Sequence, residues 1–147
     1  MKKQFQFKTQ KTKKVGPLDK FILRDNALKT TDKDIQLRFQ SHWYRSLPLS
    51  CMNVEVTIDG KKINESDMMI EANGNRYPVH QMPELDKEWL FITDAATLHI
   101  ENNHSLEQGK QYEVALKLDL YIPYIILGPE QKPLLASSVL TKTLSCN

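Results

Sequence analysis

The sequence predicts an all-β fold, an antiparallel β-sandwich of jelly-roll type with little helix. Apolar and polar side chains alternate along most of the chain, which is typical of strands with one buried face. No stretch of a dozen residues repeats the i, i+3, i+4, i+7 apolar pattern, and at most a short helical turn fits around Met82–Glu88. Parallel strands need long crossovers, usually helices. Two packed antiparallel sheets are therefore the expected way to bury the apolar faces.

Four segments carry the alternation most clearly. In each of them, one face of the expected strand meets a core and the other meets water or a partner. Their apolar positions are Ile35, Leu37 and Phe39; Val54, Val56 and Ile58; Leu98 and Ile100; and Tyr112, Val114, Leu116, Leu118, Leu120 and Ile122.

Turn residues punctuate these segments. Asp59-Gly60 and Asn73-Gly74 each separate two short strand-like runs, and such dipeptides are strong signals for two-residue hairpins. Pro123 lies near the end of the longest alternating segment. Because proline cannot donate a backbone hydrogen bond, it predicts an edge, a bulge or a bend there.

Length and charge limit the classes of protein to which this chain can belong. A chain of 147 residues fits one domain, expected to span residues 1–147. The 20 basic residues nearly balance the 18 acidic ones, for a net charge of +2, which argues against a nucleic-acid-binding domain. The longest apolar run, Leu120 to Leu127, is far shorter than the ~20 residues of a membrane helix. Without a secretory signal, we expect a cytoplasmic protein in which Cys51 and Cys146 stay reduced.

The N-terminal region is basic. Residues 1–14 contain six lysines and no acid, and Phe5 and Phe7 lie two positions apart. This pattern favours an edge strand whose lysines discourage pairing with other molecules. A patch that binds anions or nucleic acid is the alternative.

No catalytic or metal-binding motif stands out in this chain. It has no glycine-rich phosphate loop and no G-x-S-x-G, and its four histidines form no H-x-H pair. The acids are scattered, so no acid–base pair is marked. We expect histidines that are exposed or hydrogen-bonded, no catalytic residue, and no cofactor or metal bound by this chain.

Three segments are richer in aromatic or apolar residues than a small sandwich needs. The first is the connection after the Ile35–Phe39 segment, where aromatic residues stand beside an arginine; it is either an internal crossover or a contact surface. The second is Met82–Leu85 with Trp89–Phe91, another apolar connection. The third is Tyr121–Leu127, which is apolar on both faces past the proline and therefore needs a cover on both. The candidate cleft or interface residues are His42, Trp43, Tyr44, Arg45, Pro48, Tyr121, Tyr124 and Ile125.

The order of several short segments resembles the small β subunit of bacterial C-glycoside deglycosidases. The resemblance covers roughly residues 35–127, and it departs at Ser46, where the family has glycine. The matching pieces are Tyr44–Cys51, similar to Y-R-G-x-P-L-S-C; Val54–Gly60, a strand and its D-G hairpin; Asn73-Gly74-x-x-Tyr77; Pro83-Glu84-Leu85; Trp89 before Ala96–Leu98; and Leu106-x-x-Gly109 before Val114–Tyr124.

This resemblance implies a heteromeric lyase in which the β subunit supports a larger α subunit. The α subunit of that family has a sugar-isomerase-like (β/α)8 barrel and holds a divalent metal, usually manganese. The complex acts on a 3-oxo-C-glycoside of a flavonoid and breaks the bond between the sugar and the aromatic carbon. The ketone at C3 acidifies the C2 proton, and a metal ion stabilises the enolate that forms when a base removes it. The isolated β subunit is expected to be inactive.

Two other functions fit the same sequence. A carbohydrate-binding module would present Trp43 or Trp89 flat and exposed on a sheet face. A structural interaction domain would bind a protein partner without taking part in catalysis. The mass of the chain in solution, with and without neighbouring gene products, separates the last function from the others.

Overall fold

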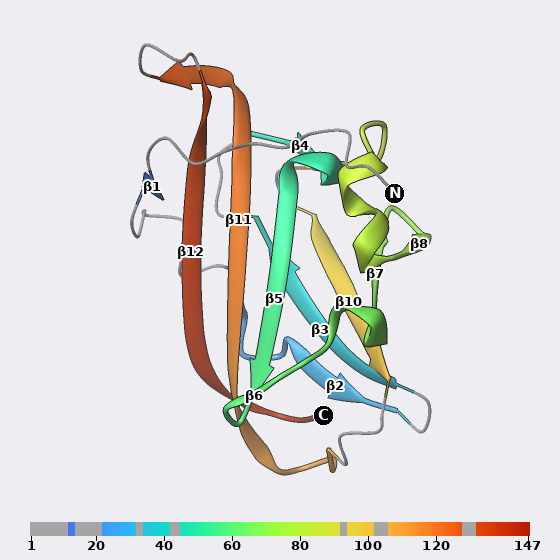
Figure 1. The fold of residues 1–147 in the computed structure, drawn as a ribbon. Helices are drawn as coiled ribbons and strands as arrows, with labels where there is room; N and C mark the ends of the chain where they lie inside the picture. The colour runs from blue at the N-terminus through green and yellow to red at the C-terminus, as the bar shows by residue number, and fades with distance from the viewer. Residues whose placement is uncertain are drawn as a thin grey trace.

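Two five-stranded sheets pack face to face in the computed structural model (Figure 1). The structure describes residues 12–13, 22–31, 34–41, 45–91, 94–101, 106–127 and 132–147, with backbone only at 12–13, 123–127 and 132–134. Sheet A has the order β1 (Thr12–Lys13), β12 (Lys132–Ser145), β11 (Gln111–Leu127), β5 (Met52–Ile58) and β6 (Lys61–Lys62). Sheet B has the order β2 (Leu28–Thr30), β3 (Asp34–Gln40), β10 (Ala95–Glu101), β7 (Met68–Ala72) and β8 (Asn75–Pro78).

The remaining described elements are short. A two-stranded ribbon pairs β4 (Leu47–Pro48) with β9 (Trp89–Leu90). Three 3-10 helices are described: η2 (Leu49–Cys51), η3 (Glu65–Asp67) and η4 (Val79–Glu84). The helical turn expected around Met82–Glu88 thus begins and ends earlier in the chain. No helix in the described residues is long and apolar enough to cross a membrane.

The core lies between the sheets and follows the period-two pattern. On β5 and β11 every second residue is buried, and the same holds on β3 and β7. The described strand pairs are antiparallel except β1 with β12. The antiparallel sandwich is therefore confirmed, while the jelly-roll connectivity stays a prediction.

Both expected hairpins are present. Asp59 and Gly60 have φ values of 49° and 80° between β5 and β6, and Asn73 and Gly74 have 56° and 82° between β7 and β8. Positive φ at both central positions is the type I′ geometry, whose twist matches that of the flanking strands. Asparagine, aspartate and glycine occupy these positions because they tolerate it best.

The β11–β12 hairpin is longer than the sandwich that it belongs to. Met52, the first residue of β5, pairs with Leu120, so β11 continues past β5 as far as Leu127 (Figure 1). The register with β12 shifts between Ile122 and Ile126, which confirms the irregularity expected at Pro123. We call Pro123–Leu127 and Lys132–Leu134 the arm.

The last residues join the two sheets. Beyond β12, the Thr30 backbone N–H donates to the Asn147 carbonyl at 3.0 Å, and the Asn147 N–H donates to the Leu28 carbonyl at 3.2 Å. The chain thus leaves sheet A and extends the β2 edge of sheet B. The strand expected at Phe5 and Phe7 lies outside the described residues.

Candidate partner-binding site

The structure places some of the predicted surface residues and leaves others undescribed. Arg45 is exposed, Pro48 is half-buried in β4, and Tyr121 is half-buried in β11. Tyr124 and Ile125 lie in the arm, where the backbone is described. The predicted residues outside the described part of the chain are His42, Trp43 and Tyr44.

The fold brings the two predicted segments to the same end of the sandwich. β4 and η2 lead directly into β5, whose first residue pairs with Leu120. The arm therefore starts beside the point where the Arg45–Cys51 segment enters sheet A (Figure 1). Two segments that lie some 70 residues apart in the sequence thus share one neighbourhood, as the register of β5 and β11 requires.

The β4–β9 ribbon exposes two aromatic side chains at this end. Leu47 pairs with Leu90, and both are buried, which fastens the ribbon to the core. Trp89 and Phe91 flank Leu90 and are 41% and 51% exposed. Alternate residues of an extended chain share a face, so we call these two residues the aromatic patch. Large exposed aromatics are enriched in protein interfaces and in their energetic centres.

A carboxylate holds the patch in position. The Oε1 atom of Glu88 accepts hydrogen bonds from the Tyr77 hydroxyl at 2.6 Å and Asn75 Nδ2 at 2.9 Å, and Oε2 accepts one from Asn73 Nδ2 at 2.9 Å. Asn73 Nδ2 also donates to the Trp89 carbonyl at 2.6 Å. These bonds, that from Tyr77 first, lower the pKa of Glu88 and so favour its charged form. The β7–β8 hairpin therefore anchors the segment that carries the patch.

Tyr121 contacts its own sheet. Its hydroxyl accepts a hydrogen bond from Asn53 Nδ2 on β5 at 3.3 Å. Burial, followed by the nearby Asp119 carboxylate, raises the pKa of Tyr121, so the phenol stays neutral at physiological pH. Asp119 in turn accepts a hydrogen bond from the Ser137 hydroxyl on β12. Tyr121 thus ties β11 to its neighbour at the base of the arm.

A second polar cluster lies on the outer face of sheet B. His99 is 8% exposed, with Nδ1 2.6 Å from Asp34 Oδ2 and Nε2 2.7 Å from Glu71 Oε1. The three side chains come from β3, β10 and β7 and span three neighbouring strands. Since the two carboxylates face different ring nitrogens, they do not converge on one point as metal ligands would. In the described part of the chain, no group of three or more His, Cys, Asp or Glu could hold a metal ion.

Neither polar cluster follows from the sequence pattern alone. Nothing local distinguishes Glu88 from the other acids, although the Asn73–Tyr77 hairpin that holds it stands out as a motif. The expectation that His99 is exposed or hydrogen-bonded is confirmed, but the pattern does not identify its partners. Polar residues at alternate positions of β3, and the single acid Glu71 on β7, are the available signal, yet the pairing register decides which of them meet.

The fold and the surface together define the class of protein. It is an antiparallel β-sandwich that exposes the aromatic patch beside the arm. Residues 18–124 match the model of the family described as C-glycoside deglycosidase beta subunit. Since that match covers most of the sequence, the chain belongs to this family.

Named relatives agree with this assignment. A C-glycoside deglycosidase beta subunit of Microbacterium trichothecenolyticum is 34% identical over 108 residues, which are 73% of this chain and 81% of the relative. A protein of the same name from Arthrobacter globiformis is 27% identical over 109 residues, covering 74% and 83%. A 3'-dehydrocarminate deglycosidase beta subunit from a Microbacterium species is 27% identical over 105 residues, covering 71% and 78%.

Proposed function

We propose that this chain is the β subunit of a heteromeric carbon–carbon lyase that cleaves the C-glycosidic bond of 3-oxo-C-glucosylated flavonoids. Membership of the β-subunit family carries the proposal. The partner is an α subunit with a sugar-isomerase-like (β/α)8 barrel, and the divalent metal, manganese, belongs to that subunit. The name of one relative specifies a dehydrogenated glycoside, which supports a keto sugar as the substrate.

The role of this chain is to bind and position the α subunit. The aromatic patch, residues Arg45–Ser50 and the arm lie at one end of the sandwich. Together with His42–Tyr44 they are the proposed interface, with the His42–Ser50 segment closest to the substrate cleft. A permanent interface buries over roughly 2,000 Å² and has an apolar centre. Trp89 and Phe91 supply apolar area, and Arg45 supplies a guanidinium group, the kinds of residue that dominate binding energy.

The test compares single variants in co-purification with the α subunit, turnover of the complex and thermal melting. Trp89→Ala, Tyr44→Ala or Arg45→Ala should each weaken assembly by roughly 2 kcal/mol or more, because such anchors carry most of the interface energy. If His42 lines the cleft, its loss should lower turnover while the complex still forms. Val139→Ala is the matched control, since Val139 is an exposed apolar residue on β12, 58% exposed, and should leave assembly unchanged.

Unchanged assembly and turnover with a lower melting temperature would contradict the interface. The His42–Ser50 segment would then be an internal crossover whose aromatics pack on the core.

The exposure of Trp89 also favours one alternative, a carbohydrate-binding module. In that case the isolated chain should bind glucosides through stacking on the indole, and Trp89→Ala should abolish this binding. Two results together would favour the carbohydrate-binding module over the lyase subunit. They are saturable binding of a simple glucoside by the isolated chain and the absence of a complex on co-expression with the α subunit.

A further inference from the structure

The second half of β12 is an outer edge of sheet A. β1 pairs with β12 only at Leu135 and Ala136. Among the described residues, no strand pairs with the outer side of Val139–Ser145, and no backbone hydrogen bond reaches it (Figure 1). We call Val139–Ser145 the open edge. An edge strand of this kind presents a row of unpaired N–H and C=O groups, to which another strand can bind.

The other edges of the two sheets are protected against such pairing. In sheet B, β2 exchanges two backbone hydrogen bonds with Asn147, and β8 carries Arg76 and Pro78. At the far edge of sheet A, β6 consists of only two exposed lysines, Lys61 and Lys62. Covering segments, short strands, charged side chains and proline are the usual devices that keep sheet edges from pairing. The open edge has no such device on its exposed face.

The exposed side chains of the open edge are uncharged. They belong to Val139, Thr141, Thr143 and Ser145 and alternate along the strand with the inward side of β12, where Leu144 is buried. Val139 is 58% exposed, more than either aromatic of the patch. Three of the four are β-branched, and such side chains favour strands and pack well across a pair of them. The chemistry of this surface therefore suits a further strand.

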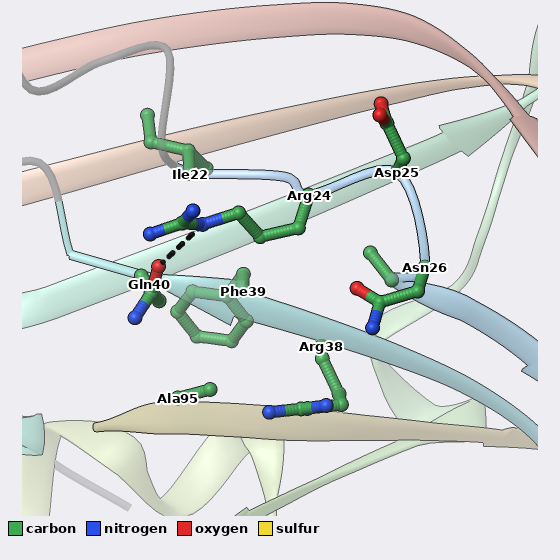
Figure 2. A pocket seen from close by; sticks show the side chains of 9 residues that line it. Ile22, Arg24, Asp25, Asn26, Arg38, Phe39, Gln40 and Ala95 are labelled. Carbon is green, nitrogen blue, oxygen red and sulfur yellow. Dashed lines mark hydrogen bonds between the residues drawn. The ribbon is translucent and has the colours of Figure 1, made fainter. Parts of the chain in front are cut away.

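The one charge in the open edge is directed away from its exposed face. Lys142 pairs across the sheet with the buried Val114, so its side chain leaves the strand on the inner side. Its Nζ lies 2.6 Å from Asp25 Oδ1 and donates to the Leu23 carbonyl at 3.3 Å. Figure 2 shows the Asp25 carboxylate on the side of its turn that faces β12. A charge that is already paired within the chain does not repel an incoming strand.

We propose that two copies of this chain pair through the open edge, as antiparallel strands related by a two-fold axis at Thr141. In this register each Thr141 lies opposite its own copy, and Val139 lies opposite Thr143 of the second copy. Lys142 lies opposite Leu140, so no like charges meet, whereas an axis at Lys142 would oppose two lysines. A self-complementary edge of this kind gives a closed two-fold dimer, the commonest form of oligomer.

The pairing leaves the proposed α-subunit surface of both copies free. β12 begins in the arm and runs away from it toward Asn147. Antiparallel pairing of two β12 strands therefore places the two arms at opposite ends of the joined sheet. A dimer can thus bind two α subunits at once. Only this last statement rests on the proposed function, because the pairing itself concerns this chain alone.

Sedimentation of the purified full chain over a wide range of concentration tests the pairing. The mass should rise from that of the 17.1 kDa monomer to twice this value. Thr141→Lys should raise the dimer dissociation constant tenfold or more, because it places two ammonium groups opposite each other. Ser66→Lys is the matched control: Ser66 is an exposed residue of η3, gains the same charge, and should leave the dimer unchanged. Both variants should melt like the unmodified chain.

A cysteine variant tests the register. Directly opposite residues of antiparallel strands have Cβ atoms about 4.5–5.5 Å apart, so Thr141→Cys should form a disulfide between two copies on mild oxidation. Ser66→Cys should not, and the natural Cys51 and Cys146 are buried.

Three results would overturn the proposal. The first is a chain that sediments as a monomer at every concentration. The second is a dimer that Thr141→Lys does not weaken or that Thr141→Cys does not cross-link, which would place the contact on another surface. The third is a monomeric chain whose assembly with the α subunit is lost in Thr141→Lys and kept in Ser66→Lys. In that case the α subunit, and not a second copy, would occupy the open edge, and the proposed function would stand.

Discussion

Buried on the outer face of a sheet, His99 contacts two carboxylates at once. A neutral imidazole has one N–H and can donate to only one of them, whereas the protonated ring donates to both. The hydrogen bond from His99 is the main cause that lowers the pKa of Glu71. Burial alone would raise the pKa of Asp34, but hydrogen bonds from His99, Thr31 and Gln36 bring it below its ordinary value. Both acids are thus held in the charged form by folding.

The stability contributed by these acids should depend on pH. A carboxyl whose pKa is lowered by folding stabilises the protein above its unfolded pKa of about 4, and this stability is lost as the pH falls through the lower folded value. Asp34→Asn should therefore reduce the free energy of unfolding at pH 7, by roughly 1–2 kcal/mol. The difference from the unmodified chain should shrink toward pH 3.

Urea unfolding at pH 7, 5 and 3 measures this difference. Asp94→Asn, at an exposed position before β10, is the control and should have little effect at any of these pH values. A difference for Asp34→Asn that grew on acidification would contradict the assigned role of the Asp34–His99–Glu71 cluster.

Sequence alone does not identify these contacts because they depend on strand register. His99 lies 65 positions from Asp34 and 28 from Glu71, and no local pattern links them. By contrast, composition does single out the segment around Arg45 and Pro48, because aromatics beside an arginine are rare in ordinary loops. Only the fold, however, shows that β4 pairs with the strand that carries Trp89.

At the scale of elements, the two type I′ hairpins offer a matched comparison. Gly60 and Gly74 have nearly the same φ, +80° and +82°, and at neither residue does another atom lie within 4 Å of the point that a Cβ would occupy. Alanine at either site should therefore cost about 1 kcal/mol, from backbone strain alone. Only the β7–β8 hairpin holds Glu88, so only Gly74→Ala should also weaken assembly with the α subunit.

Thermal melting and co-purification of the two variants give the answer. We expect Gly60→Ala and Gly74→Ala to lower the melting temperature by the same amount. Only Gly74→Ala should also weaken assembly with the α subunit. Equal effects on assembly would show that the β7–β8 hairpin does not position the aromatic patch.

The arm supports a second prediction at this scale. Ile122 pairs directly with Leu134, so replacing residues 123–133 by Asn-Gly would close β11 and β12 with a two-residue hairpin. The shortened chain should keep its fold, because the sandwich ends where β5 begins, and it should lose affinity for the α subunit. Circular dichroism checks the fold and co-purification checks the affinity. If the shortened chain assembles normally with the α subunit, the arm is not part of the interface.

The sequence predicts a strand where apolar and polar residues alternate regularly. It does not predict one where this alternation fails. The alternation in β5 and β11 predicts both strands, and Pro123 predicts the irregular register. β12 escapes prediction because its buried and exposed positions contradict residue type: Ser138 is buried, whereas Val139 is exposed. Pairing with β11 along its whole length decides the conformation of β12, so the local sequence does not have to.

For the molecule as a whole, we predict that the isolated chain has no lyase activity and binds no stoichiometric metal. The physical reason is that no group of ligands in the described residues could hold an ion, and without a bound metal the enolate would lack the Lewis acid that stabilises it. Metal analysis of the purified chain and incubation with a 3-oxo-C-glucoside test this directly. Stoichiometric manganese or zinc, or turnover without the α subunit, would contradict the division of labour between the subunits.

The hydrogen bonds between Asn147 and β2 bear on how the protein is made. Translation releases the chain from its N-terminus, and β2 emerges long before its last neighbour. The edge of Leu28–Thr30 that faces away from β3 therefore stays unpaired until residue 147 has left the ribosome. Contacts between such distant parts of a chain slow folding, and unpaired edges promote aggregation while they last.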